Sequence, residues 1–487
     1  MRCRRSVCLA LLLGPACASA ANAHGFGPRY DLPLPLSLYV WGAGATVALS
    51  FVVMALFLRR AHDHERFRIA WNCQNGFVDA LLPSVRALAV VLLALVIVAG
   101  LFGSQDPVRN IAPVMVWIIG WVALTFICAF VGNAWQPINP WSTVFGAAES
   151  LYGRIRPGET LGLARPYPEK LGVWPAFILF VAFAWMELIW SGKSVPADLA
   201  AALLLYSALT WLGMFIFGRE AWLRHGEFLT LVFGIFARFA PILRMPDGRC
   251  LLRPPALGLL EPRPLPMSMV ALVVALLATV TFDGFLETPL WARADLAVLN
   301  AAPDSAMAAA FDLREDQAVR VVRTFALIAC VALFIGAYAA FCWLTAAVAG
   351  ERDVTAGLVV RRFVLTLVPI ALAYHVAHYF SFLFIGGQYA IPRLSDPFGW
   401  GWNLFGTARY EIDIGIVTPR LQWTVAVVAV VLGHVIAVYL SHVTALQVFR
   451  ERAAALRSQV PMLVLMVGYT MISLWILSQP IVETGAG

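Results

Sequence analysis

The chain has 487 residues, of which 61% are hydrophobic and 13% are charged. Soluble domains carry about 25% charged residues, so this composition excludes an ordinary soluble protein and indicates a lipid bilayer as the main partner. Lysine and arginine outnumber aspartate and glutamate by 35 to 28, which gives a net charge of +7. This excess is too small to indicate a nucleic-acid-binding protein.

The first 23 residues have the pattern of a secretory signal peptide. A short apolar core at 7–13 follows a basic start, and small residues occupy 18–23. Cleavage after Ala23 would make His24 the first mature residue, and a competing site follows Ala20. The sequence does not decide between these two cleavage positions. The basic residues of the leader are Arg2, Arg4 and Arg5, and their removal lowers the net charge to 32 − 28 = +4.

Ten apolar stretches are long enough to cross a bilayer, which takes about 20 residues of helix. They begin near Ser37, Ser84, Ile111, Val173, Pro196, Met267, Thr324, Phe363, Leu421 and Pro461. We therefore predict an all-α fold, with 24–487 forming a single polytopic membrane helical bundle of about ten transmembrane helices. The shorter apolar segment 228–242 contains Arg238, and we interpret it as an interfacial or re-entrant helix. The 388–420 segment is predicted to cap the outer face.

Arginine distribution predicts the direction of the spans. The loops predicted to lie inside are rich in arginine, whereas the outer loop 283–323 is mainly acidic. Because positive residues favour the cytoplasmic side, both termini are expected in the periplasm of a bacterium, with the bundle in the inner membrane. The arginines that carry this argument include Arg59, Arg60, Arg66, Arg68, Arg154, Arg156, Arg361, Arg362, Arg450, Arg452 and Arg457.

The cysteines do not indicate a fold held together by disulfide bonds. Five remain after the leader, an odd and scattered set that argues against a disulfide framework. We expect most of them to be small buried hydrophobic side chains. They are Cys73, Cys128, Cys250, Cys330 and Cys342.

Three histidines are predicted at membrane depth. His375 and His378 lie three residues apart on the eighth span and so share a helical face, and His434 reaches a similar depth on the ninth span. Ionisable groups at this depth are functional candidates by default. Neutral imidazoles are good ligands for zinc or copper. The alternative is that each ring donates to a nearby carbonyl or polar side chain.

Two carboxylates lie near the predicted outer ends of the spans, Glu187 on the fourth and Asp283 on the sixth. Either group can complete a metal centre or act as a catalytic acid or base. The alternatives are a helix cap or arginine partner for Asp283 and a polar network for Glu187. His24, if it is the mature N-terminus, can chelate a metal through its amine and its ring, a geometry known from copper sites, and the alternative is a frayed terminus.

Four segments resemble bacterial membrane proteins known as fenitrothion hydrolases, and the likeness extends over nearly the whole chain. They are the run from His24 to Gly42, Asn139-Pro-Trp141, Thr281-Phe-Asp283-Gly-Phe and Ala377-His378-Tyr-Phe-Ser. The resemblance implies a polytopic inner-membrane protein with a signal sequence. It also implies hydrolysis of an organophosphorus triester, with release of a nitrophenol from a thiophosphate insecticide.

We therefore expect a metal-dependent hydrolase whose lipophilic small-molecule substrate arrives through the bilayer. A divalent copper or zinc ion would be held by His375, His378 and His434 with His24 as an outer ligand, and Asp283 and Glu187 would be the catalytic carboxylates. Two other classes stay open. A periplasm-facing copper acquisition or delivery protein would use the same histidines without catalysis. A transporter, or an assembly subunit with a protein partner, would use them as a relay or packing network.

Overall fold

The computed structural model describes residues 32–58, 69–72, 76–245, 249–301 and 314–479. The predicted signal peptide and His24 lie outside these ranges. Within these ranges, ten helical segments are long and apolar enough to cross a membrane, so the predicted all-α bundle of about ten spans is confirmed. They are Leu36–Phe57, Ala80–Phe102, Ile111–Phe130, Glu169–Leu188, Pro196–Phe217, Met267–Leu286, Asp316–Ala349, Ala356–Ser395, Pro419–Val448 and Arg452–Ser478.

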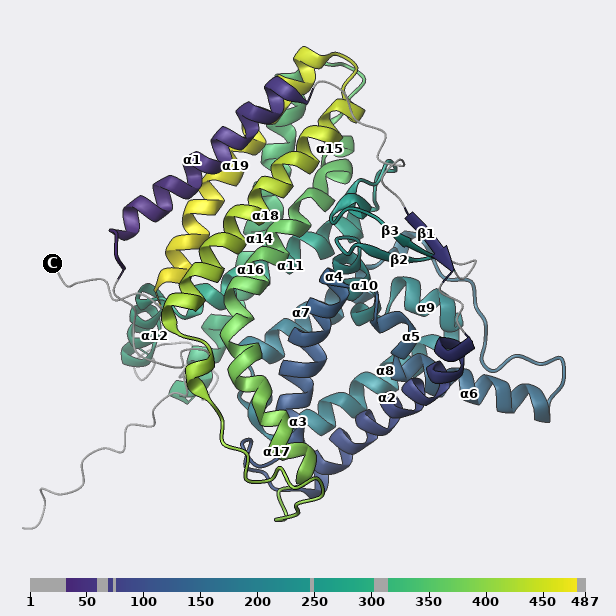
Figure 1. The fold of residues 1–487 in the computed structure, drawn as a ribbon. Coiled ribbons are helices and arrows are strands. Elements are labelled where there is room, and N and C mark those ends of the chain that lie inside the picture. Colours follow the sequence, from purple (N-terminus) through teal and green to yellow (C-terminus); the bar gives the residue numbers. More distant parts are fainter. Residues whose placement is uncertain (1–31, 59–68, 73–75, 246–248, 302–313, 480–487) are drawn as a thin grey trace, which may run out of the picture.

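Several spans are single helices and others are composite (Figure 1). The single helices are α1 (Leu36–Phe57), α2 (Gly76–Phe102), α7 (Trp174–Leu188), α8 (Pro196–Phe217), α11 (Met267–Leu286), α14 (Glu315–Ala349), α18 (Pro419–Val448) and α19 (Arg452–Ser478). The third span joins α3 (Ile111–Pro113), the π-helix η2 (Val114–Ala123) and α4 (Leu124–Phe130). The eighth joins α15 (Ala356–Phe363), a 3-10 turn (Val364–Leu367), α16 (Val368–Ser381), the π-helix η7 (Phe382–Gly386), a second 3-10 turn (Gly387–Tyr389) and α17 (Ala390–Ser395).

Shorter elements connect the spans. Apart from single 3-10 turns, they are α5 (Trp135–Ile138), α6 (Pro140–Ile155), α9 (Arg219–His225), α10 (Phe228–Ala237), α12 (Pro289–Ala301) and the strands β1 (Ile69–Asn72), β2 (Ile242–Arg244) and β3 (Arg249–Leu252). Helix α10 is ten residues long, too short for a span, as predicted for this segment. Its N-terminus is capped by the buried Glu227, which accepts from the backbone N–H groups of Leu229 and Thr230.

Helices α11 and α16 form the centre of the molecule. An apolar 18-residue stretch of α11 is 83% buried, against 17% for α1. Helix α11 contacts α7, α14 and α16, and α16 packs on α18 (Figure 1). Polar side chains on α11 and α16 are therefore enclosed by protein, where an ionisable group needs a partner.

A small antiparallel sheet, in the strand order β1-β3-β2, was not predicted from the sequence. One expectation about the cysteines is corrected here. Cys128, Cys330 and Cys342 are free, but Cys250 in β3 is disulfide-bonded. Cys250 lies opposite Trp71 in a strand pairing that joins segments almost 180 residues apart, and the spacing of the cysteines in the sequence does not indicate such a pairing.

The segment after α16 covers the end of the bundle at which α2 and α7 terminate, which we call the outer end. Asp396 accepts the backbone N–H groups of Trp400 and Gly401. The Phe398 carbonyl accepts from Ser104 N–H, in the turn that follows α2. This segment therefore covers that end of the bundle, and its position on the periplasmic side stays a prediction.

Candidate functional site: a buried acid-base array

Helices α11 and α16 place a histidine and an aspartate in direct contact. His378 Nε2 lies 2.8 Å from Asp283 Oδ2, and the two residues are 7% and 6% exposed. Asp283 is near the C-terminal end of α11, and His378 faces it from α16. Two of the predicted site residues are thus brought together in the outer half of the bundle.

Tyr379 connects this pair to the third predicted residue, Glu187 of α7. Its hydroxyl lies 2.8 Å from Asp283 Oδ2 and 2.9 Å from Glu187 Oε1. Tyr379 was not among the site residues predicted from the sequence. The available signal was its position next to His378, which lets one turn of α16 present both side chains to α7 and α11. We call Glu187, Tyr379, Asp283 and His378 the acid-base array.

The contacts of the array set its proton count. The Tyr379 hydroxyl carries one hydrogen, so it can donate to only one carboxyl oxygen. Its other contact therefore requires a carboxyl group that carries its own proton and donates it to the Tyr379 oxygen. Asp283 Oδ2 also faces His378 Nε2. All contacts are satisfied when Asp283 is ionised and Glu187 is protonated. The array then holds one acidic proton shared by two carboxyl groups.

His375 lies beside the array, against the ring of Tyr379. Its ring packs 4.6 Å from the Tyr379 ring and 5.7 Å from the Trp121 ring, between centroids. The residue is 3% exposed, and its Nε2 has no hydrogen-bond partner among the described residues. Its surroundings are mainly aromatic.

His434 has the local partner that we gave as its alternative. Its Nδ1 lies 2.8 Å from the Val430 carbonyl oxygen, one turn earlier on α18, and its ring packs beside that of Tyr469. The residue is buried. The structure shows no contact between His434 and the array in the part of the chain that it describes.

The predicted metal set is not assembled within the described ranges. No group of three or more histidine, cysteine, aspartate or glutamate side chains there is arranged to hold a metal ion. Asp283 Oδ2 is already engaged by His378 and Tyr379. His24 lies outside the described residues. Copper or zinc stays a prediction.

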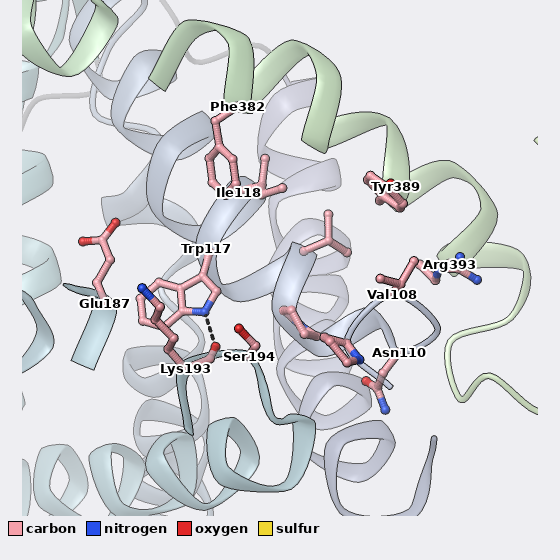
Figure 2. Close-up of a pocket in the computed structure, with 13 residues that line it drawn as sticks. Val108, Asn110, Trp117, Ile118, Glu187, Lys193, Ser194, Phe382, Tyr389 and Arg393 are labelled. Carbon is pink, nitrogen blue, oxygen red and sulfur yellow. Dashed lines mark hydrogen bonds between the residues drawn. The ribbon is translucent and has the colours of Figure 1, made fainter. Parts of the chain in front are cut away.

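A pocket of about 230 Å³ lies at the outer end, with Glu187 in its wall (Figure 2). Most of the wall is apolar, and Lys193 and Arg393 add two cations. Trp117 of η2 stands between Glu187 and Arg393, and its Nε1 donates to the Lys193 carbonyl oxygen at 2.8 Å (Figure 2). The side chains that line the pocket are Pro107, Val108, Asn110, Pro113, Val114, Trp117, Ile118, Glu187, Lys193, Ser194, Phe382, Tyr389 and Arg393.

A second cavity of about 340 Å³ shares Trp117 with this outer pocket. It is lined by α2, η2, α5, α6, α7, α8 and α10, and nearly all of its lining side chains are apolar. The arrangement can therefore hold a lipophilic molecule on either side of Trp117 and transfer a proton at Glu187.

Comparisons with protein-family models, with curated proteins and with solved structures found no match for this chain.

Proposed function

We propose that this chain is a membrane-embedded hydrolase of lipophilic organophosphorus triesters, with Glu187 as its catalytic acid-base group. The observation that carries the proposal is the Tyr379 hydroxyl between two carboxyl groups, one of which lines the outer pocket. The resemblance to fenitrothion hydrolases agrees with this chemistry. We place the protein in a bacterial inner membrane with both termini in the periplasm, as the arginine pattern predicts.

The two cavities suit a substrate with an apolar body and one polar centre. Apolar walls favour aryl and alkyl groups, and the larger cavity gives a lipophilic ester a place to enter from the bilayer. In the outer pocket Lys193 and Arg393 supply positive charge. They would stabilise the oxygen or sulfur bound to phosphorus, and the departing aryloxide, as negative charge develops there.

Proton transfer along the array prepares Glu187 to act as a base. When Glu187 gives its proton to the Tyr379 oxygen and Tyr379 gives its own to Asp283, Glu187 becomes ionised beside the pocket. A water molecule can then attack phosphorus while Glu187 takes its proton, and the bond from phosphorus to the aryl oxygen breaks. The aryloxide leaves as an anion. Asp283, beside His378, holds the displaced proton until the array resets.

Release of nitrophenol from fenitrothion by purified protein in lipid nanodiscs tests the proposal. Glu187→Gln and Tyr379→Phe are expected to slow release by about 100-fold or more, because each interrupts proton transfer. Tyr338→Phe is the matched control, since it also removes a buried tyrosine hydroxyl, one that donates to the Val360 carbonyl oxygen at 2.9 Å in another part of the bundle. Equal release by wild type and Glu187→Gln would refute the role of Glu187. Chelation and metal addition to the same samples test the predicted copper or zinc.

A proton-coupled transporter is the second candidate, because the array runs in a line from the outer pocket to the buried pair of His378 and Asp283. In this case the protein would move protons in liposomes that contain a pH-sensitive dye, and Asp283→Asn would stop the movement. Nitrophenol release without proton movement favours the hydrolase. Proton movement without release favours the transporter.

A further inference from the structure

We infer that a small cavity beside Glu187 holds one ordered water molecule that connects His375 to the acid-base array. The cavity measures about 20 Å³ and lies among α7, α10, α11, α16 and η2. A water molecule needs roughly 10–15 Å³ measured in this way, so the space accepts one water and little more. The water site itself does not depend on the reaction, whereas its role below rests on the proposed function.

Two unsatisfied polar atoms belong to side chains that line this cavity. Trp121 Nε1 and His375 Nε2 have no hydrogen-bond partner among the described residues, and the two residues are 6% and 3% exposed. Buried polar atoms in folded proteins nearly always have a partner, and an ordered water is a common one. Two such atoms at one cavity indicate that the partner is shared.

The remaining polar groups of the wall complete the coordination of a water. Glu187 and Tyr379 also line the cavity. The hydroxyl of Thr279, the other polar side chain there, already donates to the Ala275 carbonyl oxygen at 2.9 Å. A water can accept the Trp121 N–H and donate its two hydrogens to His375 Nε2 and a Glu187 oxygen. Three partners are typical of buried waters.

This water extends the array by one histidine. The hydrogen-bonded line then runs from His375 through the water to Glu187, Tyr379, Asp283 and His378. His375 is buried among aromatic rings, so it stays neutral and its Nε2 accepts a hydrogen from the water. The water donates its other hydrogen to Glu187 and is held in place by both residues. His375 is thus a positioning residue that orients the water against Glu187.

A high-resolution structure of the full-length protein in nanodiscs tests the water directly. We expect density within hydrogen-bond distance, about 3 Å, of both His375 Nε2 and a Glu187 oxygen. An empty cavity would overturn the inference. Density with the anomalous signal of a metal ion would overturn it as well, because the occupant would then be a cation. Neither result depends on hydrolysis.

A cavity-filling variant with a matched control tests the connection to Glu187. Ala184 lies on α7, is buried and lines the cavity, so Ala184→Val adds two carbons at the water position and keeps every polar group. Ala176→Val makes the same change at another buried position of α7 that does not line the cavity. The readout is the infrared band of the protonated Glu187 carboxyl, identified by its loss in Glu187→Gln.

We expect Ala184→Val to shift this band and Ala176→Val to leave it in place. The same band position in wild type and both variants would overturn the connection. His375→Leu gives a second route if Ala184→Val does not fold, because it removes the ring nitrogen and should weaken the water density. A water that is present without nitrophenol release would support the site and contradict the hydrolase. Nitrophenol release by a protein whose cavity is empty would support the hydrolase and contradict the water site.

Discussion

Glu287 lies one helical turn beyond Asp283, as the residue that caps the C-terminus of α11. Partial burial, followed by the negative charge of Asp283, raises the pKa of its carboxyl above the ordinary value of 4.5. The folded protein therefore binds this proton more tightly than the unfolded chain does. Its contribution to stability is present at low pH and is lost as pH rises from the unfolded pKa through the folded one.

Glu287→Gln removes the charge and keeps the shape of the side chain. We expect the variant to melt at a higher temperature than wild type at about pH 7, and at the same temperature near pH 3, where Glu287 is protonated in both states. Thermal unfolding in detergent at the two pH values measures this. Glu411→Gln is the control, because Glu411 is exposed and water screens its charge. A variant that melts below wild type at pH 7 would show that the Glu287 charge is stabilising.

Individual residues of the site differed in how far the sequence could place them. His378, Asp283 and Glu187 were predicted because an ionisable side chain inside an apolar span stands out from its neighbours. Tyr379 was missed because a tyrosine in a membrane helix is ordinary. His434 was predicted as a site residue from its position along the ninth span, but that position does not fix the direction of the ring. Its contact with the Val430 carbonyl, one turn earlier on the same helix, depends on the side-chain rotamer of His434, which no sequence pattern encodes.

At the level of elements, the contact between α16 and α18 holds the array in place, and it depends on a glycine. A Cβ atom at Gly433 of α18 would overlap the Ala373 Cβ of α16 and lie 2.7 Å from the Pro369 carbonyl oxygen. Small residues allow this close approach of helix backbones in membranes. Because α16 carries His378 and Tyr379, a change in this contact also moves the array.

Gly433→Ala is expected to destabilise the protein by about 1–3 kcal/mol, since the two helices must separate to admit the methyl group. It should also slow nitrophenol release. Gly468→Ala in α19 is the matched control, because a Cβ there meets no atom within 4 Å. That change should be neutral or stabilise by about 0.5–1 kcal/mol, through the lower backbone freedom of alanine. Unfolding in a denaturing detergent measures both, and equal stability of the two variants would contradict the packing argument.

The elements themselves were predictable where a long apolar run fixed them. All ten spans were found, because a bilayer imposes length and internal hydrogen bonding on every crossing segment. Irregular features of the structure were not predicted from the sequence. The π-helix η2, which places Trp117 between the two cavities, contains no proline and reads as ordinary apolar helix. The strands β1 and β3 are four residues each and pair across almost 180 residues of chain, so no local periodicity marks them.

For the whole molecule, side-chain contacts gather the arginine-rich loops at one end. Arg361 donates to the Leu265 carbonyl oxygen, and Arg452 donates to that of Ala55, so loops from distant spans meet there. The positive-inside rule assigns this end to the cytoplasm. The disulfide of Cys250 lies at the same end, and disulfides normally persist in oxidising compartments. The two observations favour opposite orientations.

Reporter fusions decide between these orientations. We expect alkaline phosphatase fused to the C-terminus to be active and green fluorescent protein fused there to be dark, because ten spans after the predicted signal peptide would return the chain to the periplasm. Reporters inserted in the loop 351–355, at the arginine-rich end, should give the opposite result. The arginine pattern is the stronger argument, since it involves several loops and the disulfide only one. Fluorescence of the C-terminal fusion would show that the orientation is the opposite of the predicted one. In that orientation the Cys250 bridge lies in the oxidising periplasm and the Glu187 pocket opens to the cytoplasm. The substrate would then have to be a cytoplasmic compound.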